Sequence, residues 1–573
     1  MKKKHRNQFI SRLLAMCLAA VMMLSMGITA SAALTANPIY NFTVSGFDTT
    51  TSAPTVTAYQ IIKVNIDDVT GQPEYPMYTW AEPVATWLKR NDTYKGYVDE
   101  KLGINAVADA FADGKVSAAN MTKFLEELAA AIKTDTANAF VSLFKREVNA
   151  SNGTASFIDM AMGEYLIVAS GGVKIYKPTT VKLVPKYDGN KHDWVVGDAV
   201  VAGGGAAAQV KGSAPQIDKT VLKNGSDDTA DRTTAIGDTV TFKLAADIPS
   251  YPEDAHKTFI ISDTVGTGLS YQTGTVKVYS DSDCKDLIDS KLYTTTETNA
   301  TVPDQSGKTR TFKIEFKADF FKAQSVSGKV YVTYDAKVNS DAFKKNPSGE
   351  MHNDAYLGYN NNPYVSTGYT EVEDRETVYT YAIDLTKVTT GGQAIINNTA
   401  TFELKSGDSV LYFTGSNGVY THAAAGTQGA TTDLMTSTTD GTLKLQGLDE
   451  GTYILTETNA PDGYVLPSGT ITIMIKDADG SGVLDGKLDP GKGGENVEPL
   501  GGAEIYGRST TDDGVDVNGT MISFKVVNKT AAQGLFELPV TGGAGTVIFT
   551  MAGILLMGGA VALLVVVLRR KRS

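Results

Sequence analysis

The fold class is decided by the stretch TVTFKL at residues 239–244, together with KVYVTY at residues 329–334. In both stretches apolar residues alternate with polar ones, which is the period of a half-buried β-strand. Similar short runs rich in Thr, Val, Tyr and Ile recur along most of the chain, separated by Gly, Asn, Asp and Pro. This pattern predicts an all-β protein built of tandem immunoglobulin-like β-sandwich domains.

One region departs from the strand pattern. Between residues 107 and 148 apolar side chains recur at helical spacing: Phe124, Leu125, Leu128, Ala131 and Ile132. Because this period of about 3.6 residues places them on one face of a helix, we expect the first domain to be a sandwich with helical insertions.

The N-terminus is typical of a secretory signal peptide over residues 1–32. Residues 2–6 are basic, residues 13–26 are apolar, and Ala30-Ser31-Ala32 supplies small residues for cleavage. The exported mature chain is therefore expected to begin at Ala33. Of the two cysteines only Cys284 remains in it, so no intrachain disulfide is possible.

The C-terminus carries three signals in a fixed order. A pentapeptide comes first, then an apolar run over residues 546–568, and last the basic residues 569–572. The run is long enough to cross a bilayer as one helix, at about 20 residues, and the basic end is typical of a cytoplasmic stop. The pentapeptide is Leu538, Pro539, Val540, Thr541 and Gly542.

Composition excludes several classes of function. The formal net charge of -12 disfavours binding to nucleic acid, which requires clustered cations. Five histidines and one mature cysteine leave few ligands for a metal, and we find no zinc-type spacing. Neither a phosphate-binding glycine loop nor a nucleophile elbow is present. We therefore expect no metal, no cofactor and no turnover enzyme.

Two domain boundaries can be argued from sequence. Residues 202–208 form a flexible Gly/Ala stretch and Pro215 follows, so a first domain is expected over residues 33–214. The run IDLTKV at 383–388 is similar to QIDKTV at 216–221, which indicates a repeated unit. Domains are therefore expected over residues 215–380 and 381–533, followed by the C-terminal signal at 538–573.

The C-terminal signal resembles the cell-wall sorting signal of Gram-positive surface proteins, which a sortase cuts between Thr and Gly. That bond is Thr541–Gly542 here. The resemblance implies transient membrane insertion through the C-terminal helix, cleavage by sortase, and a secreted product anchored to peptidoglycan at the bacterial surface.

LTETNAPDGY at residues 455–464 is similar to the E-box, ETxAPxGY, of the B-type repeat domains of collagen-binding adhesins and pilins. In that family a Lys on the first strand bonds covalently to an Asn on the last, and the E-box Glu lies between them. The resemblance implies Lys387, Asn528 and Glu457 for these roles.

The residue types suit that chemistry. Burial lowers the pKa of a Lys amine and raises that of a carboxyl, so the amine can become a nucleophile and the carboxyl an acid. We expect Glu457 to donate a hydrogen bond to the Asn528 carbonyl and to carry the proton to departing ammonia. The alternative is an ordinary buried Lys–Glu pair beside an unrelated Asn.

The middle segment resembles the isopeptide-forming domains of pilin shafts. HNDAYLGYNNNP at residues 352–363 is similar to their N-x-A-x-L-x-Y-x-N-N-P ending. The resemblance implies Lys219 and Asn353 as the bonded pair and Asp263 as the acid, with Asp238 and Asp247 as competing acids.

AYQIIKV at residues 58–64 and GEYLIV at 163–168 resemble strands of the N-terminal domain of Spa-type backbone pilins. That family joins the next subunit to a Lys in a motif close to W-x-x-x-V-x-V-Y-P-K. Trp194 matches the front half of this motif, but the Gly/Ala stretch interrupts the motif before Lys211. The run VKLVPKY at residues 181–187 keeps the Pro-Lys pair and makes Lys186 a second candidate. Lys211 is favoured for its place at the domain junction, and the alternative for both is a solvated surface lysine.

Together these resemblances imply a backbone pilin, the structural subunit of a covalently polymerised pilus. Its partners would be sortase, other pilin subunits and peptidoglycan. The alternative is a singly anchored adhesin that binds a host or mucosal ligand and needs no acceptor lysine. A secreted hydrolase would require paired carboxylates or a nucleophile with its base, and the sequence pairs none.

Overall fold

The computed structural model describes residues 39–531, except 112–113, 191–192, 197–207, 224–225, 228–231, 253, 303–308, 324–327, 345–348, 367, 478, 486–496 and 507–515. The predicted signal peptide, the pentapeptide Leu538–Gly542 and the predicted transmembrane helix lie outside the described residues. Within the described ranges, no helix combines the length and the apolar character needed to cross a membrane.

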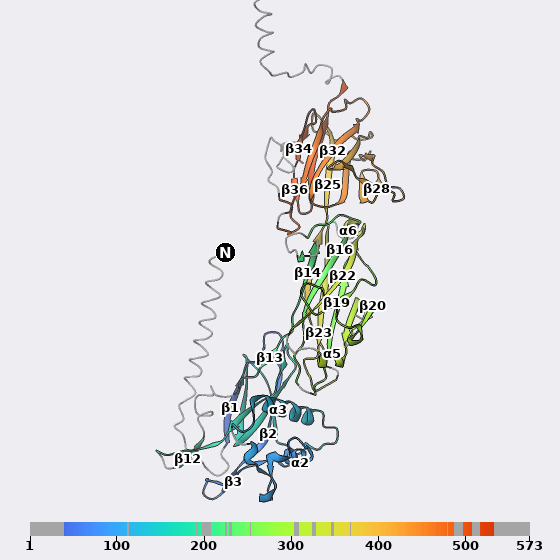
Figure 1. The fold of residues 1–573 in the computed structure, drawn as a ribbon. Helices are drawn as coiled ribbons and strands as arrows, with labels where there is room; N and C mark the ends of the chain where they lie inside the picture. Colours follow the sequence, from blue (N-terminus) through green and yellow to red (C-terminus); the bar gives the residue numbers. More distant parts are fainter. Residues whose placement is uncertain are drawn as a thin grey trace, which may run out of the picture.

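Three β-rich regions follow one another from end to end (Figure 1). We call them the N-terminal region (described residues 39–213), the middle region (217–379) and the C-terminal region (381–531). Strands hold 50% of the described residues and helices only 11%, so the all-β prediction is confirmed.

The N-terminal region is built on one seven-stranded sheet of order β10-β8-β2-β3-β5-β4, with β6 also paired to β2. Three two-stranded ladders complete it: β1 with β7, β9 with β13, and β11 with β12. The strands are β1 (Ile39–Ser45), β2 (Thr55–Ile66), β3 (Pro73–Trp80), β4 (Val98–Asp99), β5 (Ala106–Val107), β6 (Lys145–Asn149), β7 (Thr154–Ala161), β8 (Gly163–Ser170), β9 (Ile175–Tyr176), β10 (Thr179–Leu183), β11 (Pro185–Asp188), β12 (Asp193–Val196) and β13 (Gly212–Ser213).

The predicted helical insertion is confirmed. Helix α3 (Ala118–Lys133) contains all five residues that define the helical period, and the Ser117 side chain caps its N-terminus. Its Phe124 is fully buried and packs edge-on against Trp80 of the sheet and against Phe111. The other helices here are α2 (Glu82–Arg90) and the 3-10 turns η1 (Lys95–Tyr97), η2 (Glu100–Leu102) and η3 (Asp109–Phe111).

The middle region is a sandwich of two antiparallel sheets. One has the order β15-β14-β16-β22-β18 with β19 also on β22, and the other β20-β21-β17-β23-β24. The strands are β14 (Ile217–Lys223), β15 (Ser226–Asp227), β16 (Thr239–Asp247), β17 (Phe259–Val265), β18 (Leu269–Tyr271), β19 (Lys277–Tyr279), β20 (Tyr293–Thr301), β21 (Thr309–Phe316), β22 (Lys329–Val338), β23 (Glu350–Tyr359) and β24 (Thr370–Tyr379), with η4 (Ser290–Leu292), α5 (Ala318–Ala323) and α6 (Asp341–Lys344) between them.

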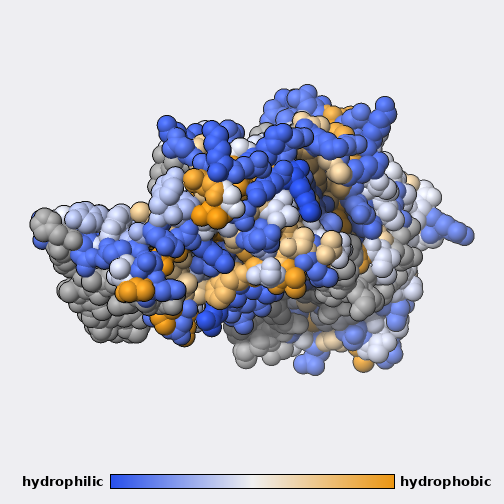
Figure 2. Space-filling view, turned by 90° about the horizontal axis from the view of Figure 1, so that it is seen from below, coloured by the Kyte–Doolittle hydropathy of each residue, from blue (hydrophilic) through white to orange (hydrophobic). Residues whose placement is uncertain are grey.

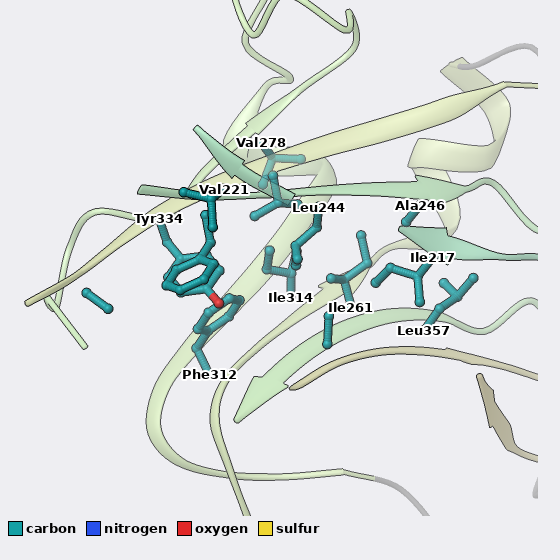
Figure 3. Close-up of a cluster of buried hydrophobic side chains, with 14 of the residues drawn as sticks. Ile217, Val221, Leu244, Ala246, Ile261, Val278, Phe312, Ile314, Tyr334 and Leu357 are labelled. Atoms are coloured by element: carbon teal, nitrogen blue, oxygen red, sulfur yellow. The ribbon is translucent and has the colours of Figure 1, made fainter. Parts of the chain in front are cut away.

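The period of two in TVTFKL appears directly in this core. Val240, Phe242 and Leu244 of β16 are buried, and Leu244 faces Ile314 and Ile261 from the opposite sheet (Figure 3). Alternate residues of a strand point to one face, so a single face of β16 supplies the core.

The C-terminal region is also a two-sheet sandwich. Its sheets have the orders β28-β29-β31-β25-β37-β35, with β36 on β37, and β27-β26-β32-β33-β34, with β30 on β26. The strands are β25 (Tyr381–Thr389), β26 (Thr401–Ser406), β27 (Ser409–Val410), β28 (Tyr412–Ser416), β29 (Val419–Ala423), β30 (Leu434–Met435), β31 (Thr442–Leu448), β32 (Gly451–Asn459), β33 (Thr470–Ile475), β34 (Val497–Pro499), β35 (Ile505–Tyr506), β36 (Asp516–Asn518) and β37 (Met521–Asn528). The first strand β25 and the last strand β37 are parallel neighbours.

Backbone contacts join the middle and C-terminal regions closely. Ile236 N–H donates to the Gly447 carbonyl at 3.0 Å, and the Ile236 carbonyl lies 3.0 Å from His422 Nδ1. Gly447 has a φ of +88°, and a Cβ there would lie 2.5 Å from Ile236 Cδ1. Only glycine satisfies both the backbone conformation and the close approach.

Gly447→Ala is therefore expected to destabilise this junction by about 1–3 kcal/mol, because it adds backbone strain and a clash with Ile236. Scanning calorimetry of the ectodomain, residues 33–541, would show a lower unfolding temperature for the variant than for the wild type. Gly391→Ala is the matched control, since the nearest atom to its Cβ, Thr389 Oγ1, is 3.7 Å away. Equal unfolding temperatures for both variants would contradict the close packing.

Candidate functional site

The C-terminal region holds a cluster of three polar side chains inside its sandwich. Lys387 comes from β25 and Asn528 from β37 in one sheet, and Glu457 comes from β32 in the facing sheet. Lys387 lies on the same inward face of its strand as Ile383 and Leu385. The three polar residues are 0%, 1% and 7% exposed, so the cluster is sealed from solvent.

The Glu457 carboxyl bridges the two nitrogens of this cluster. Lys387 Nζ donates to Glu457 Oε2 at 2.5 Å, and Asn528 Nδ2 donates to Glu457 Oε1 at 2.8 Å. The Phe402 ring centre lies 5.4 Å from Lys387 Nζ and closes the apolar side. One carboxyl thus contacts both the amine and the amide nitrogen.

The prediction that Glu457 donates a hydrogen bond to the Asn528 carbonyl is wrong. The amide nitrogen, and not the oxygen, faces Glu457, because Nδ2 also donates to the Val465 carbonyl at 3.1 Å. Two acceptors on one side hold the amide in this orientation. Asn528 Oδ1 is buried and has no hydrogen-bond partner among the described residues.

Burial sets the protonation of this pair. Removal from water lowers the pKa of Lys387 to about 8, although Glu457 opposes the shift. Burial also raises the pKa of Glu457, and the nearby Lys387 opposes that shift. The two pKa values move toward each other, so a neutral amine beside a neutral acid becomes accessible at ordinary pH.

The middle region holds a second cluster, divided between its two sheets. Lys219 on β14 faces Asp263 on β17 and Asn353 on β23. Lys219 is 2% exposed, and the other two are fully buried. Asn353 lies on β23, the next-to-last strand of this region, which is in the sheet opposite that of Lys219. A bond between the two residues would therefore connect the two sheets and not neighbouring strands.

Tyr334 on β22 completes the second cluster. Lys219 Nζ donates to Asp263 Oδ2 at 2.5 Å and to the Tyr334 hydroxyl at 2.7 Å. Asn353 Nδ2 donates to the same hydroxyl at 2.8 Å. Tyr334 was not among the residues predicted from the sequence. The sequence shows only that Tyr334 is an inward-facing residue at the end of KVYVTY, and core packing alone would explain such a residue.

Electrostatics in the second cluster follow those in the first. Burial lowers the pKa of Lys219 and raises the pKa of Asp263 to about 6. The competing acids lie elsewhere: Asp247 pairs with Lys329 at 2.9 Å, and Asp238 is exposed at a turn. Asp263 is thus the acid that the fold places against Lys219.

The two candidate acceptor lysines are both exposed and lie on different parts of the N-terminal region. Lys211 directly precedes β13, at the end that faces the middle region (Figure 1). Lys186 is in β11, which pairs with β12 toward the outer end of the same region (Figure 1).

A pocket of about 530 Å³ lies in the N-terminal region, lined by Tyr75 and Met77 of β3, by Phe111, by Lys182 of β10 and by Val184. The view from below, toward the outer end of the molecule, shows hydrophobic residues interspersed with hydrophilic ones (Figure 2). In the part of the chain that the structure describes, no group of three or more His, Cys, Asp and Glu is placed to hold a metal ion.

Sequence comparisons identify the C-terminal region and the tail that follows it. The profile of the SpaA prealbumin-like fold domain matches residues 382–487, and that of the LPXTG cell wall anchor motif matches residues 531–573. The trypsin-resistant surface T6 protein of Streptococcus pyogenes serotype M6 is 24% identical over 475 residues, which cover 73% of this chain and 81% of that protein.

The chain also matches two solved structures over most of its length. The T6 backbone pilin of serotype M6 Streptococcus pyogenes is 18% identical with a TM-score of 0.49, over 87% of this chain and 100% of that chain. The major pilin SpaD from Corynebacterium diphtheriae is 16% identical with a TM-score of 0.43, over 86% of this chain and 98% of that chain. The sequence matches place a SpaA prealbumin-like fold domain in the C-terminal region and mark this chain as a cell wall-anchored surface protein.

Proposed function

We propose that this chain is the repeating shaft subunit of a covalent pilus and that two internal isopeptide bonds reinforce it. The observation that carries the second part is the Glu457 carboxyl, which contacts the amine of Lys387 and the amide nitrogen of Asn528 at once. An ordinary buried ion pair needs no such third partner.

In the C-terminal region the proposed step is an amide exchange. Lys387 Nζ attacks Asn528 Cγ and gives its protons through Glu457 Oε2, while Glu457 Oε1 protonates the departing Nδ2. The new Nζ–Cγ bond replaces the Cγ–Nδ2 bond and one ammonia leaves. Folding alone brings the groups together, so proximity supplies most of the rate. The same exchange in the middle region would join Lys219 to Asn353 with Asp263 as base.

The bonds would change how the shaft carries load. In the C-terminal region the bond would connect β25 to β37, which pair along their length from Ala382 to Thr389. A pull between the two ends of this region would then act on a covalent link and not on the hydrogen-bonded ladder. In the middle region the bond would fasten one sheet to the other, and the sandwich could not open.

Polymerisation would follow from the sorting signal. Sortase would cut Thr541–Gly542, and the Thr541 carbonyl would pass to a lysine amine of the next copy, releasing the tail that begins at Gly542. The described chain ends at residue 531, at the end of the C-terminal region that lies farthest from the N-terminal region (Figure 1). A head-to-tail stack brings these two ends together, which favours Lys186 over Lys211 as the acceptor. The last copy would be joined to peptidoglycan.

The intact mass of the ectodomain, residues 33–541, tests the internal bonds. We expect the wild type to be lighter than its sequence by two ammonia molecules. Lys219→Met and Lys387→Met keep the length of the stem and remove the nucleophile, so each variant should lack one of the two losses. Circular dichroism would confirm that both variants fold. A wild type at its full calculated mass would contradict the bonds.

The acceptor is tested in a Gram-positive host that supplies a pilus sortase. Lys186→Arg keeps the charge but removes the nucleophile, and we expect it to abolish the ladder of covalent multimers on a denaturing gel. Lys211→Arg is the matched control and should polymerise normally. The reverse result would assign Lys211, and multimers absent from the wild type itself would favour the singly anchored adhesin.

The pH dependence tests the role of Glu457. The productive pair holds one proton between Lys387 and Glu457, so bond formation should be fastest between their two pKa values. The rate should fall on acidification through the raised carboxyl pKa, because no base remains. It should also fall above about pH 8, because no acid remains for the leaving nitrogen.

The measurement starts from Lys219→Met ectodomain purified unfolded from inclusion bodies, in which only the C-terminal bond can form. It is folded by dilution at each pH, quenched in acid and weighed by mass spectrometry. A rate that rises steadily to high pH would show that Glu457 does not act as an acid.

A further inference from the structure

We propose that Tyr334 is a catalytic residue of the middle region and relays a proton from Lys219 to the departing nitrogen of Asn353. The proposal rests on the isopeptide bond of the middle region proposed above. It assigns to a neutral hydroxyl the task that a carboxyl oxygen has in the C-terminal region.

The two clusters differ in the group that contacts the asparagine amide nitrogen. In the C-terminal region both nitrogens contact the same carboxyl, one at each oxygen. In the middle region Asp263 Oδ2 contacts Lys219 Nζ, but the hydrogen bond of Asn353 Nδ2 goes to the Tyr334 hydroxyl at 2.8 Å. That hydroxyl is also 2.7 Å from Lys219 Nζ. Tyr334 therefore stands between the attacking and the leaving nitrogen.

A hydroxyl in this place can pass a proton without carrying a charge. Before the reaction it accepts a hydrogen bond from both nitrogens. During the step its own hydrogen turns to the departing nitrogen while it takes a proton from the attacking one, so the tyrosine is neutral before and after the step. As Lys219 Nζ bonds to Asn353 Cγ, the amide nitrogen becomes basic and takes the hydrogen of Tyr334. The hydroxyl regains a proton from Lys219 Nζ, the Cγ–Nδ2 bond breaks, and ammonia leaves.

Packing holds the hydroxyl where the relay needs it. Tyr334 is 1% exposed, and its ring stacks on Phe242 at 5.6 Å and meets Phe312 edge-on at 4.8 Å. Figure 3 shows Tyr334 and Phe312 together in the core. Burial raises the pKa of Tyr334 well above its usual value, which disfavours a free phenolate and suits a concerted transfer.

A purely structural role would also explain the contacts, since a buried amine and amide need partners. The two roles differ in what loss of the hydroxyl does. Tyr334→Phe keeps the ring and its packing but removes the relay. If the hydroxyl serves packing alone, the folded variant should still release ammonia at the wild-type rate.

The test uses the whole ectodomain, residues 33–541, folded by dilution from the unfolded state and quenched at intervals. Peptide mapping reports the Lys219–Asn353 and Lys387–Asn528 bonds separately. We expect Tyr334→Phe to form the middle bond about 10²- to 10⁴-fold more slowly, the usual range for a lost acid–base group. The C-terminal bond in the same molecule should form at the wild-type rate and serves as the internal control.

Tyr271→Phe is the matched control. Its hydroxyl lies in the same sandwich and donates to Glu297 at 2.9 Å, and its ring centre is 6.1 Å from that of Tyr334. It should leave both rates unchanged. Should Tyr334→Phe fail to fold, 3-fluorotyrosine placed at position 334 keeps the shape and makes the hydroxyl more acidic. It should change the rate of the middle bond alone.

The outcomes separate the two proposals. A wild type without the middle bond would overturn the crosslink itself. A wild type that forms both bonds, beside a Tyr334→Phe variant that forms them equally fast, would leave the crosslink intact and overturn the relay. An unchanged rate with fluorotyrosine would also overturn it.

Discussion

The burial of a lysine amine inside each of two β-sandwiches is the constraint on which this structure depends. The side chains of Lys219 and Lys387 have no exposed surface, and a charged group taken from water into such a core costs several kcal/mol. A carboxyl within hydrogen-bond distance offsets this cost, but it is itself destabilised as an anion. The paired groups therefore lie close to their shared neutral form, in which a lysine becomes reactive.

The neighbourhood of each amine directs that reactivity. Aromatic rings cover the apolar side of both amines, those of Phe242 and Tyr334 around Lys219 and that of Phe402 beside Lys387. On the polar side of each amine, the Glu457 carboxyl or the Tyr334 hydroxyl links it to an asparagine amide. An amide bond in place of amine and amide would remove the buried charge permanently, so the proposed reaction would relieve the constraint that makes it possible.

The two sandwiches place the same groups on different frameworks. In the C-terminal region the amine and amide come from parallel neighbouring strands, and the acid reaches them from the facing sheet. In the middle region the amide and the acid share one sheet, and the amine with Tyr334 comes from the other. A single carboxyl can touch both nitrogens in the first arrangement, whereas the second needs a further group between them.

Much of the architecture and of the candidate site was predictable from residues alone. Alternation of apolar residues indicated the strands, helical spacing located α3, and LTETNAPDGY singled out Glu457, because these signals lie within short stretches of chain. Tyr334 could not be found this way, because the sequence pattern around an inward-facing tyrosine at a strand end is the same whether the side chain only packs in the core or takes part in a reaction. The orientation of the Asn528 amide depends on Val465, which is 63 residues away in sequence. Sequence by itself determined which side chains point inward, because strand periodicity is local; only the tertiary structure decided which of them meet, because those contacts join strands from different sheets.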